Sequence, residues 1–149
     1  MEKKLVRKVS VFLALAAAFA FAFAPVAEAA RQTFGPISLV VPSGWQVTEE
    51  ETQLTFTAPG NAAFVSVIID ELEGSTLKEL AEGVAASVNG SAPVADSDGD
   101  FTFTFKNEHG VDGYAIVTGD KAKDFFVLWI VVGEHPELAA LLGSVEEAR

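Results

Sequence analysis

The run from Phe125 to Val132 is apolar at each of its positions, and this feature constrains the fold more than any other. A strand that alternates apolar and polar residues can leave one face in water, whereas a continuously apolar strand needs cover on both faces. The run therefore predicts a central strand of a sheet, with other elements packed above and below it.

The remaining strands are predicted by short β-branched or alternating runs bounded by turn residues. Thr52 to Ala58 alternates, with Leu54 and Phe56 on one face, and Phe101 to Phe105 places three phenylalanines on one face. Short links between the last three strands favour an antiparallel meander. Strands are expected at Ile37–Val41, Thr52–Ala58, Phe64–Asp70, Phe101–Phe105, Tyr114–Thr118 and Phe125–Val132, with a short extended piece at Trp45–Thr48.

Two segments change to helical periodicity. Leu77, Leu80, Val84 and Val88 share one face, Thr76 with Glu79 forms a capping box, and Asn89-Gly90 is a C-terminal stop. The second helix is expected to begin at Pro136, with Leu138, Leu141, Leu142 and Val145 on its apolar face. The order is then three strands, a helix, three strands and a helix. We predict an α+β fold: a single antiparallel sheet flanked by helices.

The N-terminus reads as a secretory signal peptide spanning residues 1–29. Lys3, Lys4, Arg7 and Lys8 precede an apolar run that ends at Pro25, and Ala27 and Ala29 occupy the two positions that a signal peptidase inspects. Cleavage after Ala29 is expected, against the alternative of retention as an N-terminal anchor. Residues 30–149 would then form one domain, periplasmic or secreted, without stable insertion in a membrane.

The chain has no cysteine and is strongly acidic. No lipid-modified cysteine, disulfide or thiolate nucleophile is available, so the exported domain is not a lipoprotein. Four of the ten basic and two of the twenty-one acidic residues precede Ala30, which leaves six and nineteen and a formal charge of −13. Such a charge disfavours nucleic acid and anionic lipid as partners, and it could favour a basic partner or cations.

The opening Ile37-Ser-Leu-Val-Val-Pro-Ser-Gly-Trp45 resembles the start of the PsbP/Mog-like fold. The Ser-Thr-Leu-x-x-Leu-Ala helix, the meander and the last helix, with His135-Pro-Glu-Leu-x-x-Leu-Leu-x-Ser144, follow in the order of that family. The resemblance implies an α/β/α sandwich and a theme of docking to a partner rather than catalysis. It transfers no functional residues, and fold alone does not give function.

Few residues suggest a metal-binding, catalytic or ligand-binding site. Asp96, Asp98 and Asp100 alternate in one loop and could converge on calcium, but Phe101 and Asn107 stand where a helix-loop-helix calcium site wants Gly and Glu. The alternative is an acidic turn that opens the next strand. His109 and His135 lie in turn or cap positions and lack the spacing of a zinc helix, so solvated histidines are expected. Trp45, Trp129 and Tyr114 could form an aromatic platform, although core packing is the expectation for both tryptophans.

No serine-hydrolase elbow, phosphate loop or dinucleotide fingerprint occurs. The leading hypothesis is an exported, non-enzymatic accessory or binding module whose partner is another envelope protein. A small-ligand or cation-binding protein that uses residues 96–100 is the first alternative, and a hydrolase with an unrecognised site is the second. The sequence leaves the oligomeric state open.

Overall fold

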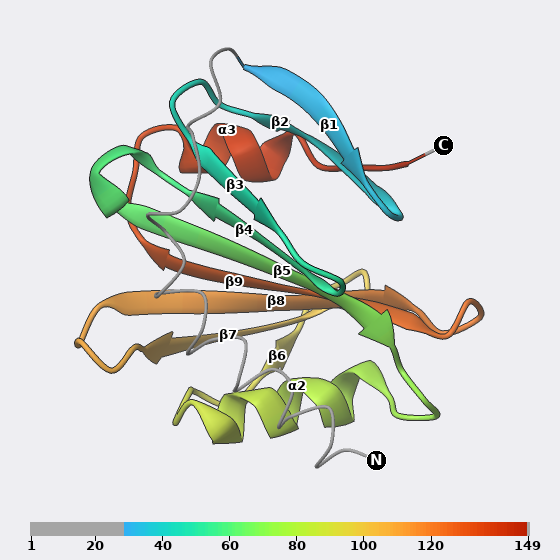
Figure 1. Cartoon of the computed structure of the whole chain (residues 1–149). Helices are drawn as coiled ribbons and strands as arrows, with labels where there is room; N and C mark the ends of the chain where they lie inside the picture. Colours follow the sequence, from blue (N-terminus) through green and yellow to red (C-terminus); the bar gives the residue numbers. More distant parts are fainter. Residues whose placement is uncertain (1–28, 149) are drawn as a thin grey trace.

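The computed structural model describes residues 29–148, which form strands and helices in the order β1–β5, α2, β6–β9, α3, β10 (Figure 1). Residues 1–28, which make up the predicted signal peptide except for Ala29, fall outside this range, so the export hypothesis stays a prediction. Of the described helices, none is long and apolar enough to cross a membrane.

The larger sheet has seven strands in the order β3-β4-β5-β9-β8-β7-β6, and every neighbouring pair is antiparallel. Its strands are β3 Gln46–Glu49, β4 Gln53–Thr57, β5 Ala63–Glu71, β6 Val94–Ala95, β7 Phe101–Lys106, β8 Asp112–Asp120 and β9 Phe125–Gly133. The predicted meander is β7-β8-β9, and the apolar strand β9 lies between β5 and β8 as expected.

A second sheet corrects the prediction of a single one. Strand β2, Ile37–Val41, pairs with β1, Ala30–Phe34, and with β10, Glu146–Glu147, in the order β1-β2-β10. The Pro42-Ser-Gly44 turn, with Gly44 at φ +84°, separates β2 from β3 and lets the chain enter the other sheet. The sequence prediction missed β1 and β10 because their polar residues carry no apolar alternation.

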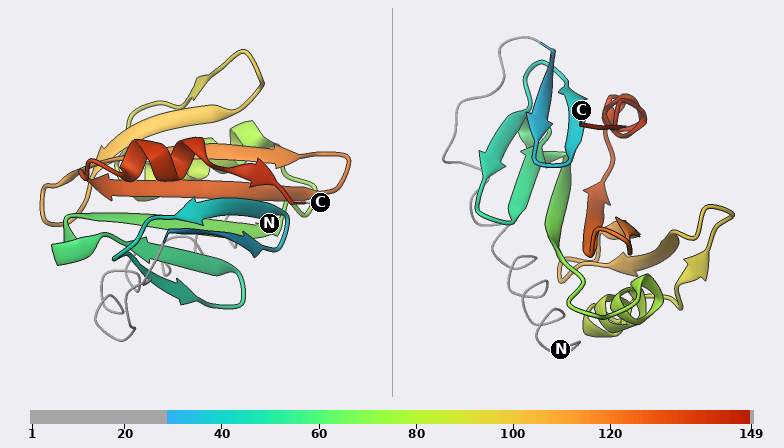
Figure 2. Two further views of the ribbon diagram at one scale, coloured as in Figure 1. Left: turned by 90° about the horizontal axis from the view of Figure 1, so that it is seen from above. Right: turned by 90° about the vertical axis from the view of Figure 1, so that its right-hand side faces the viewer.

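Strand β9 has a hydrophobic cluster on each of its faces. Val127, Trp129 and Val131 join the cluster beneath the three-stranded sheet and α3, Leu138–Gly143. Phe126, Leu128 and Ile130 join the cluster beneath α2, Leu77–Ser87. Figure 2 shows α2 on one side of the large sheet and the small sheet with α3 on the other. Cover on both faces explains the uninterrupted apolar run.

The helix ends follow the predicted signals in part. The backbone N–H of Glu79 donates to the Thr76 hydroxyl at 3.1 Å, and Gly90 N–H donates to the Ala85 carbonyl at 2.8 Å after Asn89 at φ +52°. Helix α3 begins at Leu138 rather than at Pro136, because a turn closed by Leu138 N–H on the His135 carbonyl precedes it.

Candidate functional site

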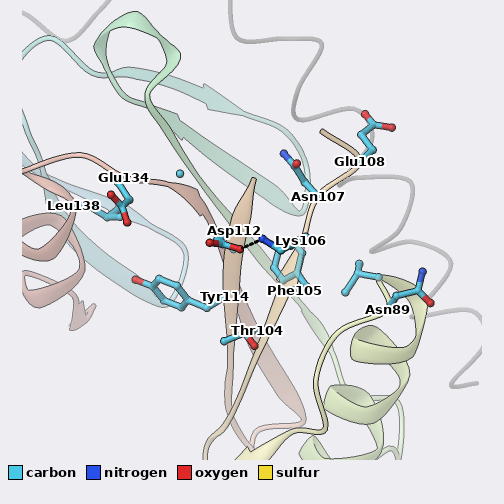
Figure 3. Close-up of a pocket in the computed structure, with 13 residues that line it drawn as sticks. Asn89, Thr104, Phe105, Lys106, Asn107, Glu108, Asp112, Tyr114, Glu134 and Leu138 are labelled. Atoms are coloured by element: carbon cyan, nitrogen blue, oxygen red, sulfur yellow. Dashed lines mark hydrogen bonds and ion pairs between the residues drawn. The ribbon is translucent and has the colours of Figure 1, made fainter. Parts of the chain in front are cut away.

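A groove of about 1030 Å³ lies at the end of the large sheet where β7 and β9 end and β8 begins (Figure 3). We call it the first groove. Its walls come from the end of α2, the β7–β8 hairpin, the end of β9 and the start of α3. The lining residues are Val88, Asn89, Thr104, Phe105, Lys106, Asn107, Glu108, Asp112, Gly113, Tyr114, Gly133, Glu134 and Leu138.

The charged residues of the first groove are one lysine and three carboxylates. Lys106 Nζ lies 2.6 Å from Asp112 Oδ1, and both side chains are well exposed. Glu108 lies 3.6 Å from His109 Nε2, on the exposed hairpin tip. Glu134 is exposed, and no ion pair to it is found within residues 29–148. Three carboxylates against one lysine give the groove an acidic character. The exposed ion pair between Lys106 and Asp112 contributes only about 0–1 kcal/mol to stability.

Tyr114 lies on the floor of the groove. Its ring points to the side on which Glu134 and Leu138 lie (Figure 3), and partial burial raises the pKa of its hydroxyl. The hydroxyl therefore stays protonated at neutral pH and can donate a hydrogen bond to a ligand. Alternation in the sequence predicted the strand but did not reveal this role, which depends on β8 lying beside the end of β9.

A second groove of about 480 Å³ lies at the other end of β8. Thr118 and Asp120 from β8 line it, together with Phe125 and Val127 from β9. The C-terminal strand forms its rim, where Glu146 lies 3.5 Å from Arg31 and Glu147 lies 3.4 Å from Lys123. The charges around this second groove are largely balanced.

The aspartates predicted as a calcium site form a turn. Asp96 Oδ1 accepts hydrogen bonds from the backbone N–H groups of Asp98 at 2.8 Å and Asp100 at 3.1 Å. Burial, and then repulsion from Asp96 and Asp98, raise the pKa of Asp100. Within residues 29–148, no three His, Asp or Glu side chains come together as metal ligands would. The calcium hypothesis stays a prediction.

The histidines and tryptophans occupy different environments. His109 is 73% exposed, as expected for a solvated histidine. His135 is only 17% exposed, its ring packs edge-on against Trp45 at 5.3 Å, and its Nδ1 accepts from Glu137 N–H at 3.1 Å. The His135 side chain therefore packs against Trp45 and closes the turn before α3, so the expectation of a solvated histidine is wrong at this position. Trp45 and Trp129 are 0% and 6% exposed, which confirms core packing over an aromatic platform.

Two solved structures share this architecture. The solution structure of cyanobacterial PsbP (CyanoP) from Synechocystis sp. PCC 6803 superposes with a TM-score of 0.52 at 14% identity, over 83% of this chain and 94% of that one. A mutant of Protein Mog1 gives a TM-score of 0.52 at 16% identity, over 80% of this chain and 96% of that one. The chain has the PsbP/Mog-like fold.

This PsbP/Mog-like likeness confirms the family resemblance seen in the sequence. At such low identity it establishes the fold alone. No protein-family model matches the sequence, and no curated protein matches it.

Proposed function

We propose that this protein is exported by its N-terminal signal and that residues 30–149 act as a non-enzymatic protein-binding module of the cell envelope. The first groove is the observation that carries the binding role. It is broad, its lining mixes apolar and uncharged polar side chains with carboxylates, and it lies at the end of a rigid sheet. The PsbP/Mog-like fold supports the same role, because the family resemblance implies docking to a partner.

The ionisable residues of the groove support binding over catalysis. Lys106 and Asp112 neutralise each other, and the two histidines lie elsewhere, one on the hairpin tip and one against Trp45. General acid–base catalysis needs a base within hydrogen-bond reach of the reacting group and held by a third residue. The groove residues offer contact area and hydrogen bonds instead.

Cell fractionation and photo-crosslinking test the proposal. We expect the protein outside the cytoplasm with Ala30 as its first residue. A photoreactive phenylalanine analogue at Glu134, in the first groove, should yield one discrete crosslinked protein in intact cells. The same analogue at Glu82 on α2 is the matched control, because Glu82 is also exposed and lies on the opposite side of the sheet.

Two results would count against the proposal. Finding the protein in the cytoplasm with residues 1–29 still attached would refute the proposed envelope role. The absence of any discrete crosslink, from either position or from further exposed positions around the domain, would remove the binding role.

A further inference from the structure

The turn between β9 and α3 forms one wall of the first groove. Glu134 and Leu138 line the groove, and three residues lie between them. The backbone N–H of Glu134 donates to the Ala62 carbonyl at 3.2 Å, which ties the start of the turn to the link before β5. The N–H of Leu138 donates to the His135 carbonyl at 3.1 Å. The position of this wall therefore depends on the hydrogen bonds made by residues 134–138.

The His135 ring provides a hydrogen-bond acceptor at the start of α3. Its Nδ1 accepts from the backbone N–H of Glu137 at 3.1 Å. Glu137 is the N-cap residue of α3, and its own side chain makes no capping hydrogen bond. Because the N–H groups at the start of a helix have no partner within the helix, the His135 ring supplies a partner that the helix itself lacks. This bond joins the middle of the groove wall to the first turn of α3.

The bond between Glu137 and His135 requires a neutral ring. A ring nitrogen that accepts a hydrogen bond carries no proton, so the single ring proton of neutral His135 is on Nε2. On protonation Nδ1 becomes a donor, and it would then face the Glu137 N–H, also a donor, at 3.1 Å. Two donors cannot form a hydrogen bond with each other, so one of them must move. Histidine side chains ordinarily change charge between about pH 5 and 8.

The carboxylate of Glu137 supplies the alternative partner for a charged ring. Its Oε1 lies 4.0 Å from Nδ1 of His135, which is too far for a hydrogen bond but close enough for an ion pair. A charged ring that turns toward Oε1 exchanges the bond from the backbone N–H for a charge-assisted bond to the carboxylate. The two bonds use the same nitrogen and cannot form together. The turn therefore has two discrete arrangements, and the charge of one ring selects between them.

The other charged groups near His135 do not compete with this exchange. Among residues 29–148, Glu137 is the only carboxylate within 4.0 Å of a ring nitrogen of His135. The neighbouring segments Pro42–Trp45, Pro59–Ala62 and Leu138–Gly143 contain no ionisable side chain. On the groove side, the titratable groups are Lys106, Glu108, Asp112, Tyr114 and Glu134. Carboxyl, amino and phenol groups of these types ordinarily keep one charge state between about pH 5 and 8, so the histidine is the group that changes.

We propose that His135 is a pH-sensitive switch on the first groove: the neutral ring holds the wall formed by residues 134–138, and the protonated ring releases the Glu137 N–H and shifts that wall. His135 is a positioning residue, because it acts through Glu134 and Leu138 and does not line the groove itself. The inference rests on the proposed binding function and adds its regulation. The module then binds its partner at neutral pH and releases it on acidification.

NMR and tryptophan fluorescence test the switch on the protein as its host produces it. The ring nitrogens of His135 and the amide of Glu137 are followed from about pH 8 to about pH 5. We expect the Nε2–H tautomer at the higher pH, and a Glu137 amide resonance that moves as His135 is protonated. The fluorescence of Trp45 should change over the same range, because its buried ring lies edge-on to His135 at 5.3 Å.

His135→Asn separates the acceptor from the charge. An asparagine side-chain oxygen can accept the Glu137 N–H as Nδ1 does, but it does not titrate. The variant should therefore keep the neutral arrangement at every pH and lose both the amide and the fluorescence changes. His109→Asn is the matched control, because His109 is 73% exposed on the hairpin tip, and it should leave both changes intact.

The photo-crosslink from Glu134 measures the effect of the switch on binding. In intact cells its yield should fall about two- to tenfold between about pH 7.5 and about pH 5.5, which is the range that the loss of one hydrogen bond supports. The yield should stay constant over the same range when His135→Asn is added, and it should fall as before when His109→Asn is added.

Three results would overturn the switch: an Nδ1–H tautomer of His135, a Glu137 amide that does not respond to protonation of the ring, or an unchanged pH response in His135→Asn. Equal crosslinking at both pH values, with a responding amide, would refute the regulation and leave the proposed function intact. Absence of a crosslink at either pH, with a responding amide, would refute the proposed binding function and leave the switch as a property of the fold alone.

Discussion

Gly133→Ala is the substitution whose cost the structure specifies most completely. Gly133 ends β9 with φ +84°, and a Cβ there would lie 2.3 Å from the carbonyl oxygen of Ala62. That oxygen accepts the N–H of Glu134 at 3.2 Å, so it cannot move away without losing the bond that positions this groove residue. The left-handed conformation costs about 1–2 kcal/mol for a residue with a Cβ, and the forced displacement adds about 1–3 kcal/mol.

The expected loss for Gly133→Ala is therefore roughly 2–5 kcal/mol, a large part of the 5–15 kcal/mol typical of a domain. Gly60→Ala is the matched control, because Gly60 has φ +69° but no atom within 4 Å of an added Cβ. It should lose only the conformational part, about 1–2 kcal/mol.

Urea unfolding followed by tryptophan fluorescence compares the two variants, since Trp45 and Trp129 are both buried. At a slope of about 1.5 kcal/mol per molar urea, a loss of 3 kcal/mol moves the midpoint by about 2 M. A Gly133→Ala midpoint equal to that of Gly60→Ala would refute the steric argument.

Three further predictions concern stability. Thr76→Ala should lower the free energy of unfolding by about 1 kcal/mol in urea titrations, because it removes the acceptor of the Glu79 N–H; Ser at this position should restore most of it. Leu141→Ala should cost about 2–5 kcal/mol by the same measurement, because Leu141 is 0% exposed and anchors a six-residue helix too short to be stable alone; Ala139→Gly, at an exposed position of the same helix, should cost no more than about 1 kcal/mol. Asp100→Asn should raise stability at pH 7 by less than about 0.5 kcal/mol, because the raised pKa of Asp100 means that its charged form costs the folded state free energy. That gain should vanish in melts below the ordinary titration range of aspartate, where the native side chain is protonated in both states, and a gain that persists there would contradict the electrostatic cause.

Local patterns in the sequence were sufficient for the elements that carry their own signals. The apolar run at Phe125–Val132 identified the central strand, and Thr76 with Asn89-Gly90 located the ends of α2. The second sheet could not be predicted in this way. Strand β2 finds its partners in a polar segment before it and in two glutamates more than a hundred residues later, and pairing at that distance leaves no periodic trace.

The candidate site could not be predicted from the sequence for the same reason. The first groove combines residues from α2, β7, β8, β9 and α3, which only the strand order brings together. Tyr114 appeared in the sequence as one aromatic residue in an alternating strand. Its place on the groove floor follows from the pairing of β8 with β9, in which Tyr114 lies opposite Val131.

The change from β9 to β8 explains how one sheet provides both a core and a surface. Every position of β9 from Phe126 to Val131 is buried, whereas β8 buries only alternate residues, under α2. Stability requires no apolar residue on the uncovered side, and threonine is indeed found there at 102, 104 and 118. Ile116 on this side is half-buried because it packs against the cluster beneath the small sheet and α3, whereas Val94 of β6 is 65% exposed. The exposed part of this side of β7 and β8 is therefore polar, and the apolar side chains of β8 and β9 belong to the two hydrophobic clusters on either face of the sheet.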